Sequence, residues 1–180
     1  MTNEELLKEY PFLSILNSIY PEYYYNFDDT LLDDMPNGWR KRFGLQMCAD
    51  IKQALEKNNI PIELYEVYQV KEKYGELCWY DNDICKDVKD IVDTYCFISK
   101  YVCCNCGDIH DIKMSNGWVC PYCAKCGEKF GINRCFSVGK IPNKYSYSTF
   151  ADNGLTLTTI DITETLYKIG FSKEDILLLK

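Results

Sequence analysis

Two copies of the pattern Cys-x-x-Cys-Gly constrain this chain more than any other feature of its sequence. Cys103 and Cys106 form the first copy, Cys123 and Cys126 form the second, and 16 residues separate Cys106 from Cys123. Two intervening residues let one tight turn direct both sulfurs at one ion, and two such turns complete a tetrahedron of thiolates. The spacing predicts a four-cysteine zinc ribbon in which the metal, with no open coordination position, is structural.

Neighbouring cysteines leave the identity of the four ligands less certain than their number. Cys104 can replace Cys103, Cys120 forms a second Cys-x-x-Cys with Cys123, and Cys135 follows closely. The chain has 11 cysteines and begins without the basic start of a signal peptide, so we expect reduced thiols in a cytoplasmic protein. Metal binding is then a better interpretation of the cluster than a disulfide framework.

Two features near the cluster suggest redox or catalytic chemistry, and both are weak. The tetrapeptide Cys120-Pro-Tyr-Cys123 is that of glutaredoxin active sites, but it does not follow the first strand of a βαβ unit with a whole domain behind it. His110 is the only histidine, so only one residue could serve as the base of a catalytic Cys–His pair. We expect His110 to be exposed, and the sequence singles out no catalytic residue.

The acidity of the chain is concentrated at its start. Residues 1–35 hold eight acidic side chains against Lys8, which accounts for the whole net charge of −7. Nucleic-acid-binding proteins usually show a basic patch instead, so DNA binding is disfavoured. The segment is interpreted as a solvated acidic arm, with mimicry of DNA phosphates as the alternative. No apolar run reaches the roughly 20 residues of a membrane span, so no membrane partner is expected.

Hydrophobic periodicity predicts an α+β fold: a small antiparallel sheet with flanking helices and an inserted four-cysteine zinc ribbon. Apolar spacing indicates a helix over 39–57, a β-hairpin over 60–80 and a helix over 84–98 capped by Asp81 or Asp83. In the first strand, Leu64, Tyr68 and Val70 are expected on one face. The tail is predicted as a strand over 155–162 and two short helices capped by Thr163 and Ser172.

These elements suggest three regions. Residues 1–100 are expected to form the acidic arm and a helix–hairpin–helix core, residues 101–135 the zinc ribbon, and residues 136–180 a strand and short helices packed on the core.

The hairpin combines cations with aromatic rings and is a candidate ligand site. Lys71, Lys73, Tyr74 and Trp79 together can bind a nucleotide or an anion through stacking and charge. The alternative is ordinary packing, with Trp79 in the core and the lysines solvated. Trp39 and Trp118 each follow a glycine and are interpreted as core residues.

A set of motifs over residues 8–130 resembles a family of small uncharacterised phage and prophage proteins. The matching segments are Asn37-Gly38-Trp39, Val70–Tyr80, Ser99 ahead of the first cysteine pair, and Gly117-Trp118 ahead of the second. In the family the hairpin reads VKEKFGxLRFY, and this chain carries Cys78 where arginine is common. The resemblance implies a phage or prophage source and a zinc knuckle, and it supplies no activity.

Three functions from different classes follow from the sequence. The first is a non-catalytic, zinc-stabilised phage-type binding protein that engages a host or phage protein, in counter-defence for example. The second is nucleic-acid or nucleotide binding through basic residues of the ribbon and hairpin, namely Arg40, Lys41, Arg42, Lys71, Lys73, Lys113, Lys125 and Lys129. The third is an enzyme of unknown reaction, for which no pair of residues stands out.

Overall fold

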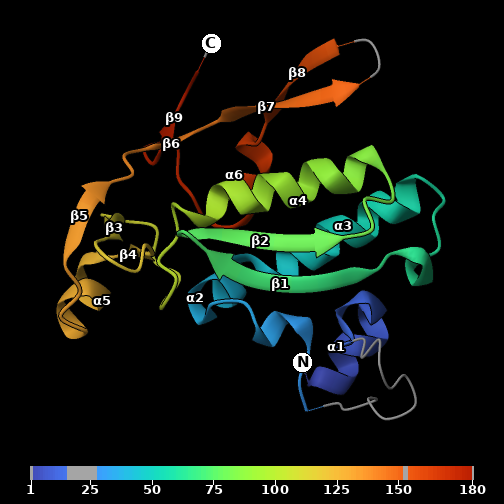
Figure 1. Ribbon diagram of the computed structural model, residues 1–180, viewed down its shortest axis with the longest axis horizontal. Helices are drawn as coiled ribbons and strands as arrows, with labels where there is room; N and C mark the ends of the chain where they lie inside the picture. The colour runs from blue at the N-terminus through green and yellow to red at the C-terminus, as the bar shows by residue number, and fades with distance from the viewer. Residues whose placement is uncertain (1, 16–27, 152–153, 180) are drawn as a thin grey trace.

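A computed structural model describes residues 2–15, 28–151 and 154–179 of the chain. The protein has an α+β fold of small, mostly antiparallel sheets with flanking helices and a cysteine-rich ribbon. In Figure 1 the β1–β2 hairpin crosses the middle of the molecule, with α4 along one side and the N-terminal helices along the other. The ribbon lies at one end, beyond the turn of the hairpin.

The N-terminal half supplies the helices that bury the hairpin. Its elements are α1 (Asn3–Glu9), 3-10 turns at Pro11–Leu13 and Leu31–Asp33, α2 (Asn37–Trp39), a π-helical turn (Arg40–Gly44), α3 (Leu45–Lys57) and a 3-10 turn at Ile62–Leu64. The apolar stripe predicted for the helix over 39–57 is confirmed. Its residues in the π-helical turn and α3 are all buried, namely Phe43, Met47, Ile51, Ala54 and Leu55. The predicted acidic arm falls partly outside the described residues, because these leave out residues 16–27.

The hairpin consists of β1 (Val67–Lys73) and β2 (Glu76–Asp81), paired antiparallel. The expected face of the first strand is wrong: Tyr65, Val67 and Val70 are buried, while Leu64 and Tyr68 are exposed. A register shift between Val67 and Gln69 explains the difference, because one extra residue moves the side chains before it to the opposite face.

Helix α4 (Lys86–Ser99) packs across the hairpin and leads to the cysteine cluster. The predicted cap is wrong, because the N-cap residue of α4 is Cys85 and not Asp81 or Asp83. Asp83 has a positive φ of 50°, and the carboxylate of Asp81 accepts hydrogen bonds from the Asp83 amide and from the Tyr65 hydroxyl. Within the described part of the chain no helix is long and apolar enough to cross a membrane.

The ribbon is a three-stranded antiparallel sheet with one short helix. It comprises β3 (Lys113–Ser115), β4 (Pro121–Tyr122), α5 (Ala124–Lys129) and β5 (Arg134–Ser137), with β3 in the centre. The first cysteine pair lies in the loop before β3, and the second begins where β4 turns into α5.

The C-terminal region packs on the core through apolar residues of a mixed set of elements. These are β6 (Ile141–Pro142), β7 (Lys144–Ala151), β8 (Gly154–Asp161), α6 (Thr163–Lys168) and β9 (Ile176–Leu177). The predicted strand pairs with β7, and β6 pairs parallel with β9. A helix capped by Ser172 is not present: the Ser172 hydroxyl and amide both donate to the Asp175 carboxylate, which closes a turn instead.

Candidate metal centre

Four thiols meet at the end of the ribbon nearest the core. The Sγ atoms of Cys103, Cys106, Cys123 and Cys126 all lie within 4.8 Å of one another, and those of Cys106 and Cys123 are 3.6 Å apart. Zn–S bonds of about 2.3 Å in a tetrahedron place sulfurs about 3.8 Å apart. The donor set and its spacing therefore fit one tetrahedral metal ion, with every position taken by a protein ligand.

Hydrogen bonds lower the pKa of one of these four thiols, that of Cys103, whereas burial raises the pKa of the other three. Burial alone would raise the pKa of the Cys103 thiol, but main-chain N–H groups of Cys123, Cys106 and Asn105 hold that pKa below its ordinary value. The Asn105 side-chain amide also donates to the Cys126 sulfur at 3.2 Å. Donors of this kind favour the thiolate, which is the form that binds metal.

The glycines after the two pairs serve different purposes. Gly107 has a positive φ of 81°, as expected for a knuckle turn. Gly127 lies inside α5, and a Cβ there would meet Arg134 Cδ at 2.4 Å. The Arg134 guanidinium donates to the carbonyl oxygens of Asp111 and Tyr122 and to the Asp111 carboxylate. Arginine packed on Gly127 thus ties the second knuckle to the loop that leaves the first.

The first knuckle is fastened to the core by α2 and the π-helical turn. The Gly38 amide donates to the Cys104 carbonyl oxygen at 2.8 Å, and a Cβ on Gly38 would lie 2.1 Å from the Cys103 carbonyl oxygen. Arg42 Nε donates to the Gly107 carbonyl oxygen at 2.6 Å. The motif Asn-Gly-Trp and the first cysteine pair, far apart in sequence, therefore form one packed unit.

The additional cysteines lie outside the four-thiol group. Cys104 and Cys120 are buried in the main hydrophobic core, where a hydrogen bond to Cys120 and burial raise the pKa of the Cys104 thiol. Cys135 is exposed. The tetrapeptide Cys120–Cys123 thus joins a core thiol to a cluster thiol across a two-residue antiparallel strand, and its first thiol, Cys120, does not lie at a helix start as the first thiol of a glutaredoxin does.

His110 is solvent-exposed, as expected, and lies outside the cluster. Its Nδ1 is 3.0 Å from Asp108 Oδ1 and its Nε2 is 3.7 Å from Asp175 Oδ1, so the imidazole connects the ribbon loop to the C-terminal region. This arrangement is a surface contact between two segments.

The candidate ligand set on the hairpin does not form one surface. Trp79 is only 7% exposed, and its indole N–H donates to the Tyr65 hydroxyl at 3.0 Å, so it is a core residue. Tyr74 at the turn is exposed, and its aromatic neighbour is Trp118 of the ribbon. The interpretation of Trp118 as a core residue is wrong, since it is 79% exposed, whereas Trp39 is buried as expected. A tryptophan directly after Asn116-Gly117 is a turn signal that pointed to this exposure.

Arg40 and Arg42, two of the eight basic residues considered for nucleic-acid binding, already bond to other groups of the protein. Arg40 pairs with Asp33, and Arg42 bonds to the carbonyl oxygens of Gly107 and Ile169. Cations held in this way are less free to replace counterions on a phosphate backbone.

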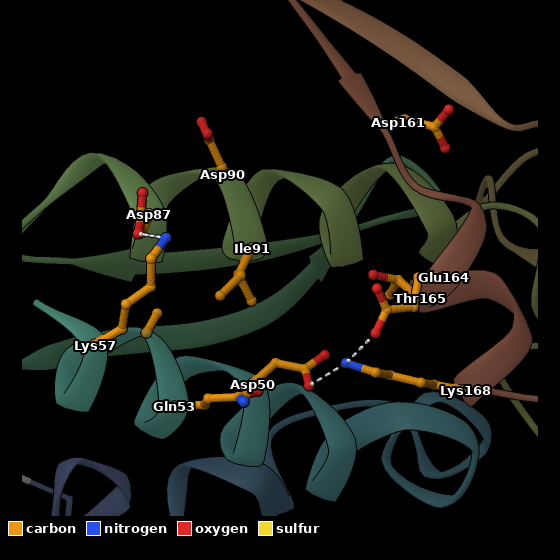
Figure 2. A pocket seen from close by; sticks show the side chains of 11 residues that line it. Asp50, Gln53, Lys57, Asp87, Asp90, Ile91, Asp161, Glu164, Thr165 and Lys168 are labelled. Atoms are coloured by element: carbon orange, nitrogen blue, oxygen red, sulfur yellow. Dashed lines mark hydrogen bonds and ion pairs between the residues drawn. The ribbon is translucent and has the colours of Figure 1, made fainter.

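A hollow with a volume of about 610 Å³ lies between α3, α4 and α6 (Figure 2). Most of its polar groups come from α3, α4 and α6, and many are paired: Lys57 with Asp87, and Lys168 with Asp50 and Glu164. Asp50 is buried and also accepts from the Tyr95 hydroxyl at 2.7 Å. The ion pair between Lys168 and Asp50 therefore joins α6 to α3 beside the apolar contacts that Leu166 makes with the core.

Comparisons with protein-family models, curated proteins and solved structures return no match.

Proposed function

We propose that this chain is a zinc-stabilised binding protein that acts without catalysis and engages a protein partner. The observation that carries the proposal is the closed set of four thiols, which leaves a bound zinc ion no position for water or substrate. When bound, the ion supplies a cross-link between the two knuckles, and its role is to hold the ribbon in one shape.

The attachment of the knuckles to the core supports a structural role for the metal. Gly38 and Arg42 bond to the first knuckle, and Arg134 joins it to the second. Metal binding therefore also stabilises the packing of the first knuckle against α2 and the π-helical turn. A surface built on a frame of this kind is pre-organised, which lowers the entropy lost on association.

The class of the partner follows from charge and from the sequence resemblance. A net charge of −7 concentrated in residues 1–35 disfavours binding to phosphate backbones, which leaves a protein surface as the favoured partner. The phage-type motifs add that the partner is a host or phage protein, with counter-defence as the biological setting.

Native mass spectrometry of the purified full-length protein, with its denatured mass beside it, tests the metal half of the proposal. We expect a mass excess of one zinc ion with reduced thiols. A disulfide at Cys120 and Cys123 without metal would contradict it. An electrophoretic shift of DNA or RNA at 50 mM salt would contradict the protein-binding half.

A further inference from the structure

The two most exposed aromatic side chains among the described residues face one recess. Trp118 is 79% exposed and Tyr74 is 78% exposed. Together with Glu72, Lys73, Gly117 and Val119 they line a hollow of about 320 Å³ between the turn of the hairpin and the β3–β4 loop of the ribbon. Tryptophan and tyrosine exposed side by side are enriched at the centres of protein interfaces.

Hydrogen bonds hold Trp118 and its loop in place. The Trp118 indole N–H donates to Glu72 Oε2 at 3.1 Å, and the other carboxylate oxygen of Glu72 accepts from the Gly75 amide at 2.7 Å. The Ser115 hydroxyl donates to the Trp118 carbonyl oxygen and accepts from the Cys120 amide at 2.9 Å. The loop is thus fixed to both the hairpin turn and the ribbon before any partner arrives.

Apolar surface continues from the recess onto the ribbon sheet. The Met114 sulfur lies 3.1 Å from the position that a Cβ on Gly75 would take, so the hairpin turn rests on β3. Phe136 of β5 is directly opposite Met114 in the sheet, and opposite residues in an antiparallel pair share a face. Phe136 is 69% exposed. The recess is therefore one end of an apolar strip that spans two structural units.

The polar groups of the recess indicate what kind of group occupies it. The Glu72 carboxylate accepts one hydrogen bond at each oxygen within the protein, and the Trp118 indole N–H is used in one of them, so the indole has no further donor for a ligand. Lys73 is different. Its ammonium lies 5.5 Å from the centre of the Tyr74 ring, and the carboxylate of Glu76, which is opposite Lys73 in the hairpin, pairs with Lys100 instead. An apolar group beside an acidic one complements this arrangement in both shape and charge.

We propose that the Trp118–Tyr74 recess is the docking site for the protein partner, and that it takes a bulky apolar side chain with an aspartate or glutamate next to it. The apolar side chain enters between the two rings, and the partner's carboxylate pairs with Lys73. This inference rests on the proposed function and adds its location and its chemistry.

A peptide selection on the zinc-loaded, full-length protein tests the inference. A displayed library of random dodecapeptides is selected, and the enriched sequence is synthesised with two variants, one with the anchor changed to Ala and one with the acid changed to Lys. Trp39 and Trp79 are buried away from a surface partner, so a change in tryptophan emission on binding chiefly reports Trp118. We expect a blue shift on binding and a shared apolar–acidic pair in the selected sequences.

Calorimetry with protein variants locates the site. Trp118→Ala should weaken peptide binding about tenfold or more, and Lys73→Glu should reverse the preference from the acidic peptide to its Lys variant. Tyr68→Ala is the matched control, because Tyr68 is an exposed tyrosine of the same hairpin outside the recess. It should leave affinity unchanged, and all three variants should keep the thermal stability of the parent protein.

The outcomes separate this inference from the proposed function. Peptides that bind Trp118→Ala as tightly as the parent protein would overturn the location and leave a protein-binding function standing. A selection that enriches no peptide above the level obtained with Trp118→Ala would overturn the inference. Quenching of Trp118 by AMP or oligo(dT), with no peptide bound, would overturn both and assign the recess to a nucleotide base.

Discussion

The indole nitrogen of Trp39 donates a hydrogen bond of 2.9 Å to the main-chain carbonyl oxygen of Val102, the residue before the first thiol of the cluster. Both residues are fully buried. Because a buried indole N–H requires a partner, this bond fixes where the chain leaves α4 and enters the knuckle. The core and the cysteine cluster are consequently packed together as one unit at this point.

Gly38→Ala should destabilise the protein strongly. The new Cβ would lie 2.1 Å from the Cys103 carbonyl oxygen and 2.6 Å from the Gly107 nitrogen, and main-chain atoms cannot move aside cheaply. We expect a loss of about 3 kcal/mol or more in the free energy of unfolding, measured by denaturant titration. Gly44→Ala is the matched control: its nearest neighbour is 3.6 Å away, and it should be neutral or slightly stabilising. Equal effects of the two substitutions would contradict the close approach.

Cys123→Ser should remove the metal and unfold at least the ribbon. Structural zinc in small sites contributes folding free energy on the order of 10 kcal/mol at neutral pH, and three thiolates cannot close the tetrahedron. Elemental analysis and amide hydrogen exchange of residues 103–137 measure the loss. Cys135→Ser, at an exposed cysteine outside the group, should keep full metal content and unchanged exchange. Full metal content in Cys123→Ser would show that another thiol acts as the ligand.

Arg42→Met should loosen the C-terminal region as well as the first knuckle. The Arg42 guanidinium donates to the carbonyl oxygen of Gly107 at 2.6 Å and to that of Ile169 at 3.3 Å, and methionine keeps the apolar stem without either donor. We expect a loss of about 1–3 kcal/mol in stability and faster amide exchange around residues 166–171. Lys41→Met, next along the chain and exposed, should change neither quantity. Slower proteolysis or unchanged exchange in Arg42→Met would oppose this role.

The contribution of Asp33 to stability should disappear at acidic pH. Burial opposes ionisation of this carboxyl, but hydrogen bonds from Thr30 and the Arg40 guanidinium hold its pKa below the ordinary value of 3.8. A lowered pKa in the folded state gives stability that is present above pH 3.8 and is lost as the pH falls through the folded-state pKa. The parent protein should therefore exceed Asp33→Asn in stability at pH 7 and approach it below pH 3.8.

Urea titrations of both proteins across this range measure the difference, and comparing the pair removes the effect of metal loss in acid. Asp34→Asn, at the exposed neighbour, is the control and should show no such dependence. A gap between the parent protein and Asp33→Asn that does not narrow as the pH falls below 3.8 would contradict the assignment.

Much of the core was predictable because periodicity reports burial directly. The stripe over 43–55 and the stripe of α4 are both on buried faces, as their spacing predicted. The first strand was not, because a bulge between Val67 and Gln69 shifts the faces and leaves no mark in the apolar pattern. The cap of α4 was also predicted wrongly. The carboxylate of Asp81 accepts hydrogen bonds from the Tyr65 hydroxyl and the Asp83 amide, and the sequence does not show that these groups lie close to it.

The sequence by itself determined that the chain has a four-cysteine cluster, because paired cysteines at a two-residue spacing are a local property of each turn. It left open which of the neighbouring thiols belongs to it. Only the tertiary structure decided that Cys104 and Cys120 lie in the core, and that Trp79 is buried while Trp118 is exposed. The physical reason is that burial depends on which segments pack together, and the pairing of α2 with the first knuckle, or of the hairpin turn with Met114, is set by contacts between residues far apart in sequence.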